Sequence, residues 1–159
     1  MIIRPAENKD KPQLIQFLND FVEYHEKHHV ISPELAPFEE YIDKDSYFQQ
    51  VADWYLNPDK SFTYVAEVER KVIGYISGFI EKRDSRKMDT KGVIEDWFVY
   101  DEYRSQGLGQ KLLEKLTETF KKQGCTHLSV NAFIDNKETI EKYRHMGFID
   151  SDITLLKKI

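Results

Sequence analysis

Two adjacent carboxylates, Glu95 and Asp96, interrupt a run of β-branched and aromatic residues between Val93 and Tyr100. Such a run is typical of a strand, and successive side chains on a strand point to opposite faces of the sheet. In a sheet that is covered on both sides, two carboxylates are hard to explain as surface residues, so at least one should face a polar cleft. A carboxylate there can accept a proton directly or through water, which makes Glu95 the candidate general base. An edge strand or a structural ion pair is the alternative interpretation.

The hexapeptide from Arg104 to Gly109, with the sequence RSQGLG, lies between this run and an amphipathic segment. Glycines let an anion approach the backbone, and the free N–H groups at the start of a helix favour phosphate. A pyrophosphate is therefore the expected ligand of this loop. The P-loop pattern is absent, and Leu112 occupies the position of the third glycine in the dinucleotide fingerprint, which makes ATP and NAD poor candidates. An ordinary glycine turn is the alternative.

Asn136 and Tyr143 lie seven residues apart in a segment with helical spacing. At about 3.6 residues per turn the two side chains share one side of a helix and can serve one ligand. A phenol within hydrogen-bond reach of a reacting group can act as a general acid. The alternative is a core tyrosine that packs beside Ile140.

Histidines and a cysteine offer two further chemistries, neither of which is expected. His25, His28 and His29 have the i, i+3 and i+4 spacing of a metal site, but no carboxylate or cysteine stands at comparable spacing, so we expect no metal. Cys125 is the only cysteine, and no base is apparent beside it. It is therefore a poor candidate for an acyl-carrying nucleophile.

The first half of the chain must position these residues with one strand, two helical segments and a hairpin. Leu14, Phe17 and Phe21 follow helical spacing after Asp10, and Pro58 ends a second, acidic helical insert. The expected elements are a strand over 1–6, a helix through 14–22, the insert over 38–56, and strands over 62–68 and 72–80 that are joined by the turn 69–71.

The second half predicts a strand-helix-strand unit followed by a last helix and strand. Leu108, Leu112, Leu116 and Phe120 recur every four residues until Gly124, which predicts an amphipathic helix. A crossover of this kind makes the strands on either side of the helix parallel. The expected elements are a loop over 82–91, a strand over 93–100, the helix, a strand at 128–132, a helix from Asp135 or Asn136 to about Met146, and a strand over 148–156.

The composition favours a single domain over residues 1–159. The chain is 40% hydrophobic, which is enough for a core, and a single cysteine excludes an internal disulfide. Its net charge of −5 disfavours nucleic acid as a partner, because binding there depends on many Lys and Arg contacts. No apolar run approaches the roughly 20 residues that span a bilayer, and no secretory signal is recognised, so we expect no membrane partner and a cytoplasmic location.

The glycine loop in this context resembles the acetyl-CoA signature of the GNAT superfamily of acyltransferases. The resemblance extends from Glu95 to Tyr103 upstream and to the spacing of Asn136, Ile140, Tyr143, Gly147 and Phe148 downstream. Weaker similarity covers 3–6 with Asp10, and 72–76. Two departures are modest, since Ser105 stands where glycine is frequent and Glu69-Arg70-Lys71 replaces a commoner Asp-Gly turn.

The resemblance implies the fold, the co-substrate and the site residues. The fold is an α/β (α+β) domain with a GNAT-like mixed, mostly antiparallel central sheet, a splayed central pair of parallel strands and flanking helices. Acetyl-CoA would be bound through its pyrophosphate by the glycine loop, while its pantetheine arm would pair with the strand that contains Val99. Tyr143 would donate a proton to the departing thiolate. The expected coenzyme-binding residues are Phe98, Val99, Arg104, Gln106, Gly107, Leu108, Gly109, Lys111, Asn136 and Tyr143.

The acids followed by Trp97-Phe98-Val99 are similar to polyamine and diamine acetyltransferases, which implies that Asp96 helps to hold a positively charged amine while Glu95 deprotonates it. The expected activity is direct acetyl transfer to a primary amine of a cationic small molecule. Acetylation of aminoglycosides or of protein amino groups, and a non-catalytic acyl-CoA-binding module, are the alternatives. A homodimer is an open possibility by the same resemblance.

Overall fold

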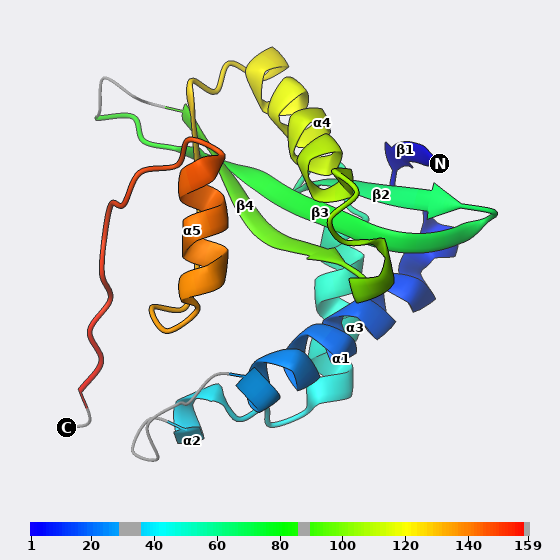
Figure 1. The fold of residues 1–159 in the computed structure, drawn as a ribbon, viewed down its shortest axis with the longest axis horizontal. Helices are drawn as coiled ribbons and strands as arrows, with labels where there is room; N and C mark the ends of the chain where they lie inside the picture. The colour runs from blue at the N-terminus through cyan, green and yellow to red at the C-terminus, as the bar shows by residue number, and fades with distance from the viewer. Residues whose placement is uncertain (29–35, 86–89, 158–159) are drawn as a thin grey trace.

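The computed structural model describes residues 1–28, 36–85 and 90–157 and builds them around a five-stranded sheet (Figure 1). The strands lie side by side in chain order, and every neighbouring pair is antiparallel except β4 and β5. Their bounds are β1 (Ile2–Pro5), β2 (Phe62–Val68), β3 (Lys71–Lys82), β4 (Thr90–Val99) and β5 (His127–Val130). The predicted fold class is confirmed, but the parallel pair lies at one edge of the described sheet and not at its centre.

Helices cover both faces of this sheet. They are α1 (Lys11–His28), α2 (Ala36–Glu39), α3 (Lys44–Tyr55), α4 (Leu108–Lys122) and α5 (Lys137–His145), with short 3-10 turns at Asn8–Asp10 and Asp101–Tyr103. On one face α1 and α3 pack against each other and bury Phe17, Phe48 and Tyr75. On the other face lies α4, while α5 stands beside β4 at the edge (Figure 1). The sheet is therefore buried on both sides, as its apolar strands require.

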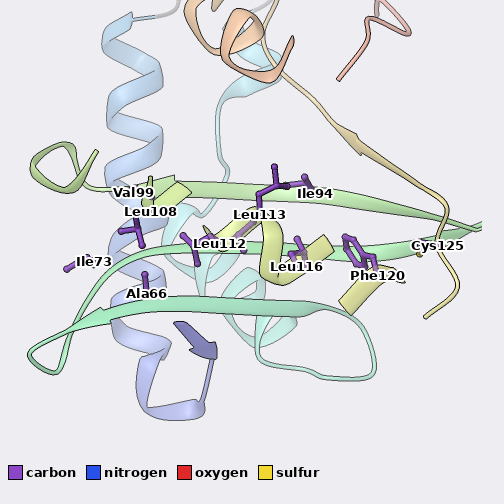
Figure 2. Packing of buried hydrophobic residues seen from close by; sticks show 11 residues of the cluster. Ala66, Ile73, Ile94, Val99, Leu108, Leu112, Leu113, Leu116, Phe120 and Cys125 are labelled. Atoms are coloured by element: carbon purple, nitrogen blue, oxygen red, sulfur yellow. The ribbon is translucent and has the colours of Figure 1, made fainter. Parts of the chain in front are cut away.

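The amphipathic helix is confirmed as α4. Its four-residue repeat of Leu108, Leu112, Leu116 and Phe120 is buried against the sheet, together with Ile73 of β3 and Ile94 of β4 (Figure 2). The repeat advances by slightly more than one helical turn per step, so one stripe of side chains faces the sheet while the lysines stay outside. This packing fixes where α4 begins, and hence where the glycine loop lies.

The predicted hairpin is confirmed, with a tighter turn than expected. Lys71 already belongs to β3 and pairs with Val68, so only Glu69 and Arg70 form the connection. Both residues have positive φ, at 49° and 68°, which is the conformation that a two-residue type I′ turn requires. The sequence lacks the usual Asn-Gly or Asp-Gly signal for this turn, and so the expected turn was one residue too long.

The acidic insert is not one helix but two. Asp43 is extended, with φ of −144°, and its side chain accepts a hydrogen bond from the backbone N–H of Ser46. A residue in this conformation is the N-cap of a new helix and cannot continue the previous one. The insert therefore breaks between α2 and α3, although its apolar residues have helical spacing throughout.

The strand predicted over 148–156 is wrong, because this segment forms no strand. Arg144 on α5 pairs with Asp150 at 2.5 Å, which holds the start of the segment against the helix. β5 also ends at Val130, so Ala132 lies beyond it and the edge that remains for pairing is short. Ile153 and Leu155 are consequently exposed. Among the described helices none is long and apolar enough to cross a bilayer.

Candidate functional site

A β-bulge in β4 brings both candidate acids to one cavity. Asp96 pairs with Ser77 of β3, but the next paired residues are Ile94 and Gly78, so Glu95 is an extra residue on the β4 side. A bulge breaks the strict alternation of side chains. Glu95 and Asp96 both line the same cavity, and the prediction that they face opposite sides of the sheet is wrong.

The same bulge marks the point where β4 separates from β5. Parallel pairing joins Lys91–Ile94 to His127–Val130 and ends there, while β4 continues through Val99. The strand pair is therefore splayed, as predicted. Beyond the bulge, the β4 backbone has no strand beside it on the β5 side among the described residues. An extended chain can add to an open strand edge of this kind by backbone hydrogen bonds.

The cavity that contains the acids has a volume of about 740 Å³ and a largely aromatic wall. Helices α1 and α3 form most of it, and β3 and β4 form its floor. Trp54 of α3 contacts Phe79 of β3 edge to face, at 5.6 Å between ring centroids. Tyr41 and Tyr47 lie near its rim, where their rings are partly exposed. Pockets of this composition are typical of small-molecule sites.

Asp96 is the more buried member of the acid pair. Its carboxylate accepts hydrogen bonds from the hydroxyl of Tyr55 on α3 and, at 3.1 Å, from the hydroxyl of Tyr75 on β3. Burial raises the pKa of Asp96, and these two hydrogen bonds oppose that rise. Asp96 is thus a fixed carboxylate whose charge is stabilised by two phenols.

Glu95 is the accessible member of the pair. Partial burial, and then the neighbouring charge of Asp96, raise the pKa of Glu95 above its ordinary value. A carboxylate with a raised pKa is a stronger base and releases a captured proton to solvent from an exposed position. These properties suit the role predicted for Glu95.

Tyr143 of α5 lies against β4, where its ring stacks on Trp97 with centroids 5.9 Å apart and planes 12° apart. Burial, together with the charge of Asp96, raises the pKa of Tyr143 to about 12. The phenol is therefore protonated at neutral pH, and its hydroxyl has no hydrogen-bond partner within the part of the chain that the structure describes. It is available as a donor.

The glycine loop presents free backbone amides at the start of α4. No side chain caps this helix, and its first backbone hydrogen bond runs from Lys111 N to Gly107 O. Gly107 has φ of 73° and no atom lies within 4 Å of where its Cβ would stand, so a ligand can approach the backbone. Ser105 has φ of 61°, which explains why glycine is expected there. The loop fits an anion such as a pyrophosphate.

Gly109 connects this loop to β4. A Cβ there would lie 3.2 Å from the Trp97 ring, so the first turn of α4 lies directly against β4 beyond the bulge. The free amides and the open strand edge are thus neighbours. Leu108, which is buried, anchors the loop between them. This arrangement fits a ligand with a pyrophosphate and an extended arm, as acetyl-CoA has.

Other predicted coenzyme residues are engaged within the protein. Arg104 donates from Nε to the carbonyl of Val99 at 2.8 Å and pairs with Asp101 at 2.6 Å. Its guanidinium therefore stabilises the end of β4. The side-chain amide of Gln106 donates to the carbonyl of Glu102. Lys111 is exposed on α4. Arg104 and Gln106 therefore shape the loop, whatever they contribute to a ligand.

The side chains of Asn136 and Phe98 also make contacts within the protein. Asn136 is the N-cap of α5, and its side chain accepts from the N–H of Thr139 at 3.2 Å. The ring of Phe98 is buried against Phe17 on the α1 side of the sheet, so only its backbone is available along β4. The sequence does not reveal these structural roles of Asn136 and Phe98.

The two alternative chemistries find no support in the structure. Cys125 is buried, and burial raises the pKa of its thiol, which makes it a poor nucleophile. His25 packs at 4.2 Å against Phe21, whereas His29 and the side chain of His28 lie outside the described residues. Within the described ranges no group of three or more metal-ligating side chains occurs.

Sequence reasoning missed three residues of the site: Tyr55, Tyr75 and Trp97. The need of a buried carboxylate for hydrogen-bond donors is the signal that could have found the tyrosines. It does not say which of the nine tyrosines supply them, because that depends on strand register and on how α3 packs.

Comparison with protein families gives a match over most of the chain. The model described as the Acetyltransferase (GNAT) family matches residues 20–148. An uncharacterized N-acetyltransferase of Methanocaldococcus jannaschii is 27% identical over 119 residues, which are 71% of this chain and 50% of that protein. The thialysine N-ε-acetyltransferase of Bos taurus is 35% identical over 57 residues, which are 36% of this chain and 34% of that protein. The chain thus matches half or less of the length of these relatives.

Solved structures share the fold at low sequence identity. A mutant of a Bacillus halodurans protein has a TM-score of 0.78 at 20% identity, with 100% of this chain and 99% of that chain covered. A predicted acetyltransferase of Clostridium acetobutylicum, solved with acetyl-CoA, has a TM-score of 0.74 at 18% identity, with 99% and 95% covered. An aminoglycoside 6′-N-acetyltransferase of Acinetobacter haemolyticus has a TM-score of 0.72 at 18% identity, with 100% and 99% covered.

Proposed function

The chain belongs to the GNAT family of acetyltransferases, and from this premise we propose that it transfers the acetyl group of acetyl-CoA directly to the primary amine of a cationic small molecule, such as a polyamine or diamine. One observation carries the proposal. The bulge in β4 brings Glu95 and Asp96 to an aromatic cavity, and the ring of Tyr143 stacks on Trp97, the next residue of the same strand. This arrangement supports Glu95 as the base, Tyr143 as the acid and Asp96 as the carboxylate that holds a cationic acceptor.

Acetyl-CoA would supply the acetyl group as an activated thioester. We assign its pyrophosphate to the amides of the loop from Gln106 to Gly109, and its extended arm to the open edge of β4 at Phe98 and Val99. Asn136 would contact the arm from the start of α5. Lys111, and Arg104 to a lesser extent because of its internal contacts, would add positive charge near the phosphates.

Glu95 and Tyr143 would carry the two proton transfers of the reaction. Glu95 accepts a proton from the acceptor ammonium, directly or through water, so that the neutral nitrogen can attack the thioester carbonyl. Tyr143 donates its proton as the carbon–sulfur bond breaks, and the free thiol leaves. A phenol with a pKa of about 12 is protonated at the start of each cycle, and it is a strong enough base afterwards to regain a proton from solvent.

A cationic acceptor is supported by charge. Asp96 has no basic residue paired with it in the described ranges, and Glu95 has none either. Two carboxylates in one cavity concentrate cations there. The name of the Bos taurus relative also indicates an amine acceptor for that protein. Aminoglycosides and protein amino groups are the alternative acceptors, and a non-catalytic acyl-CoA-binding module is the alternative function.

A turnover screen tests the proposal. Free thiol release from acetyl-CoA would be followed with panels of polyamines, diamines, aminoglycosides, amino acids and peptides. We expect the highest kcat/KM with an aliphatic polyamine or diamine. Preference for uncharged or anionic amines would contradict the cationic assignment, and binding of coenzyme A without turnover on any amine would favour the binding module.

Glu95→Gln provides the matching prediction for the base. The variant keeps the size of the side chain but cannot accept the proton, so kcat should fall by about 10²-fold or more. In the wild-type enzyme, kcat should decline as the pH falls through the raised pKa of Glu95, and this acid limb should change in the variant. A pH–rate profile of both proteins is the measurement. An unchanged profile would remove Glu95 from the mechanism.

A further inference from the structure

Asp96 is held by hydroxyl groups from two separate elements. Tyr55 belongs to the last turn of α3, and Tyr75 lies on β3 with its ring fully buried. The two rings are themselves in contact, at 5.9 Å between centroids. The carboxylate is therefore oriented by a rigid pair of phenols and not by a flexible surface partner.

Both phenols donate to one oxygen of the carboxylate. Tyr55 and Tyr75 each bond to Oδ2 of Asp96, whereas Oδ1 has no hydrogen-bond partner among the described side chains and backbone groups. A carboxylate oxygen has two acceptor positions, so Oδ1 retains its full capacity for a donor. Because Asp96 lines the cavity, a bound molecule can supply that donor.

The phenols also favour the charged form of Asp96. Burial raises the pKa of each phenol well above 10, so both hydroxyls stay protonated and donate. Their hydrogen bonds lower the pKa of Asp96 against the larger, opposing effect of burial. Loss of one donor would therefore make the carboxylate easier to protonate and leave it free to rotate.

Among the residues that the structure describes, no cationic side chain forms an ion pair with Asp96. The titratable and charged groups that share the cavity or influence Asp96 come from every element around it. They are Glu95 on β4, Tyr41 before α3, Tyr47, Asp53 and Tyr55 on α3, Lys60 after α3, Tyr75 on β3 and Tyr143 on α5. Asp53 pairs with Lys11, and no ion pair joins Lys60 to Asp96. A buried carboxylate with hydrogen bonds to neutral phenols alone remains an anion in need of a counter-charge.

We propose that Tyr55 is a positioning residue that, together with Tyr75, fixes Asp96 as the anchor for the second ammonium group of a diamine or polyamine acceptor. The inference rests on the proposed acetyl transfer and narrows its substrate class. The first amine reacts beside Glu95, while the second donates to the open oxygen of Asp96. A hydrocarbon chain between the two lies along aromatic wall residues such as Trp54 and Phe79.

The same wall argues against sugar-based acceptors. Most of the residues that line the cavity are aliphatic or aromatic, and a hydrocarbon chain can cover them. Only a minority, such as Gln50, Asn57 and Lys60, could bond to the many hydroxyl groups of an aminoglycoside, so part of that hydration would be lost without replacement. An ammonium beside aromatic rings is instead favoured by the ring quadrupoles. Lys44 shows this contact within the protein, since its ammonium lies 5.5 Å from the centre of the Phe48 ring. The preferred acceptor is therefore an unbranched chain with two or more ammonium groups.

The test is Tyr55→Phe, assayed with two probes of equal chain length, 1,4-diaminobutane and butylamine. The variant keeps the ring and removes only the hydroxyl. We expect KM for 1,4-diaminobutane to rise about tenfold, which corresponds to about 1.4 kcal/mol, with kcat nearly unchanged and with KM for butylamine unaffected. The acid limb of kcat/KM for the diamine should move to higher pH, because Asp96 is then protonated more easily.

Tyr64→Phe is the matched control. Tyr64 also bonds through its hydroxyl, to Oγ1 of Thr119 at 2.7 Å, but on the α4 side of the sheet and away from the cavity. The Tyr64→Phe variant should keep the wild-type preference for 1,4-diaminobutane over butylamine. If Tyr55→Phe does not fold, Tyr75→Phe removes the other hydrogen-bond donor to Asp96. This variant should also show a smaller preference for 1,4-diaminobutane over butylamine.

Two outcomes separate this inference from the proposed function. In the first outcome, the wild-type protein acetylates amines, but Tyr55→Phe keeps the wild-type preference for 1,4-diaminobutane or raises KM for both probes equally. This result would overturn the role of Asp96 as anchor and leave the proposed acetyl transfer in place. If no amine is acetylated, the proposed function fails, and calorimetry with coenzyme A present still tests the anchor. Equal affinity of the wild-type protein for 1,4-diaminobutane and butylamine would then overturn it.

Discussion

At the residue scale, the site contains two neighbouring carboxylates with different surroundings. Asp96 is buried and held by two phenols, whereas Glu95 is exposed on the bulge. Burial raises the pKa of both, but only Glu95 can exchange a proton readily with solvent. Two neighbouring carboxylates can take separate roles when their surroundings differ in burial and in hydrogen bonding. Tyr143 on α5 is the third titratable group of the site, and its phenol is protonated at neutral pH.

Tyr143→Phe tests the acid at this scale. The phenylalanine ring can keep the stack on Trp97, so folding and coenzyme binding should change little. Turnover should fall by about 10²-fold or more, because the leaving sulfur no longer receives a positioned proton. Steady-state kinetics and calorimetric binding of coenzyme A are the measurements. A folded variant with turnover close to that of the wild-type protein would reduce Tyr143 to a packing role.

At the element scale, one irregularity in β4 organises the site. The bulge at Glu95 redirects the two acids into the cavity, and parallel pairing to β5 stops at the same place. The N-terminus of α4 then lies against the freed part of the strand through Gly109 and Trp97. The direction of the two acids and the open strand edge thus follow from one departure from regular strand geometry, whereas the packing of α4 places the glycine loop beside them.

Gly107→Val tests the loop, with Gly124→Val as its control. Both glycines flank α4 with positive φ, at 73° and 88°, and both have open space around them, so either substitution should cost about 1–2 kcal/mol in backbone strain. Only Gly107 lies in the coenzyme loop. Saturating coenzyme A, at about 100 times its Kd, should stabilise the wild-type protein by about 2.7 kcal/mol.

The thermal shift with coenzyme A should persist in Gly124→Val and disappear in Gly107→Val. Measurement of Tm with and without coenzyme A, and with ATP as a comparison, decides between the outcomes. An absent shift in the wild-type protein, or a larger shift with ATP, would contradict the assignment of the loop.

At the scale of the whole molecule, the site depends on a sheet that is covered on both faces. One core lies under α1 and α3 and the other under α4, so the cavity and the coenzyme loop are built from different layers. Arg4 on β1 links the start of the chain to the sheet and to the first helix. Its guanidinium donates to Asp10 at 2.7 and 2.9 Å and to Glu67 on β2 at 2.6 Å. These contacts join β1, the start of α1 and β2.

Asp10→Asn tests this frame. The side chain of Asp10 is only 4% exposed, and the loss of its charge leaves Glu67 as the remaining carboxylate partner of Arg4. The loss of charged hydrogen bonds at a buried site should lower the unfolding free energy by about 1.5–3 kcal/mol. Glu138→Gln breaks an exposed pair with Lys142, which solvent screens, and should change the unfolding free energy much less. Urea unfolding of the two variants is the measurement, and equal effects would contradict the special role of Asp10.

The contribution of Asp10 should also depend on pH in one direction. Burial alone would raise its pKa, but the hydrogen bonds from Arg4 and from the N–H of Glu7 outweigh this effect and hold the pKa below its usual value. A lowered pKa in the folded state means that the stabilisation is present above about pH 4 and is lost as the pH falls through the folded pKa. The difference between the wild-type protein and Asp10→Asn should therefore shrink in acid.

Features that depend on local spacing could be predicted from the order of the residues alone. The repeat of Leu108, Leu112, Leu116 and Phe120 placed α4, and Gly107 with Gly109 placed the loop at its start. The β2–β3 hairpin followed from alternation and composition. The identity of the candidate acids was also readable, because carboxylates inside an apolar strand are uncommon. Each of these signals is contained within a few turns of helix or one strand.

Contacts between segments far apart in the chain could not be predicted in this way and became visible in the folded protein. The bulge at Glu95 is a mismatch in register between β3 and β4, which neither strand reveals alone. The pairing of Asp96 with Tyr55 depends on how α3 packs against the sheet. The failure of the segment 148–156 to form a strand depends on the short edge of β5 and on the ion pair with Arg144. Register and packing are set by the partner surface, and hydrogen bonds between remote residues leave no period in the sequence.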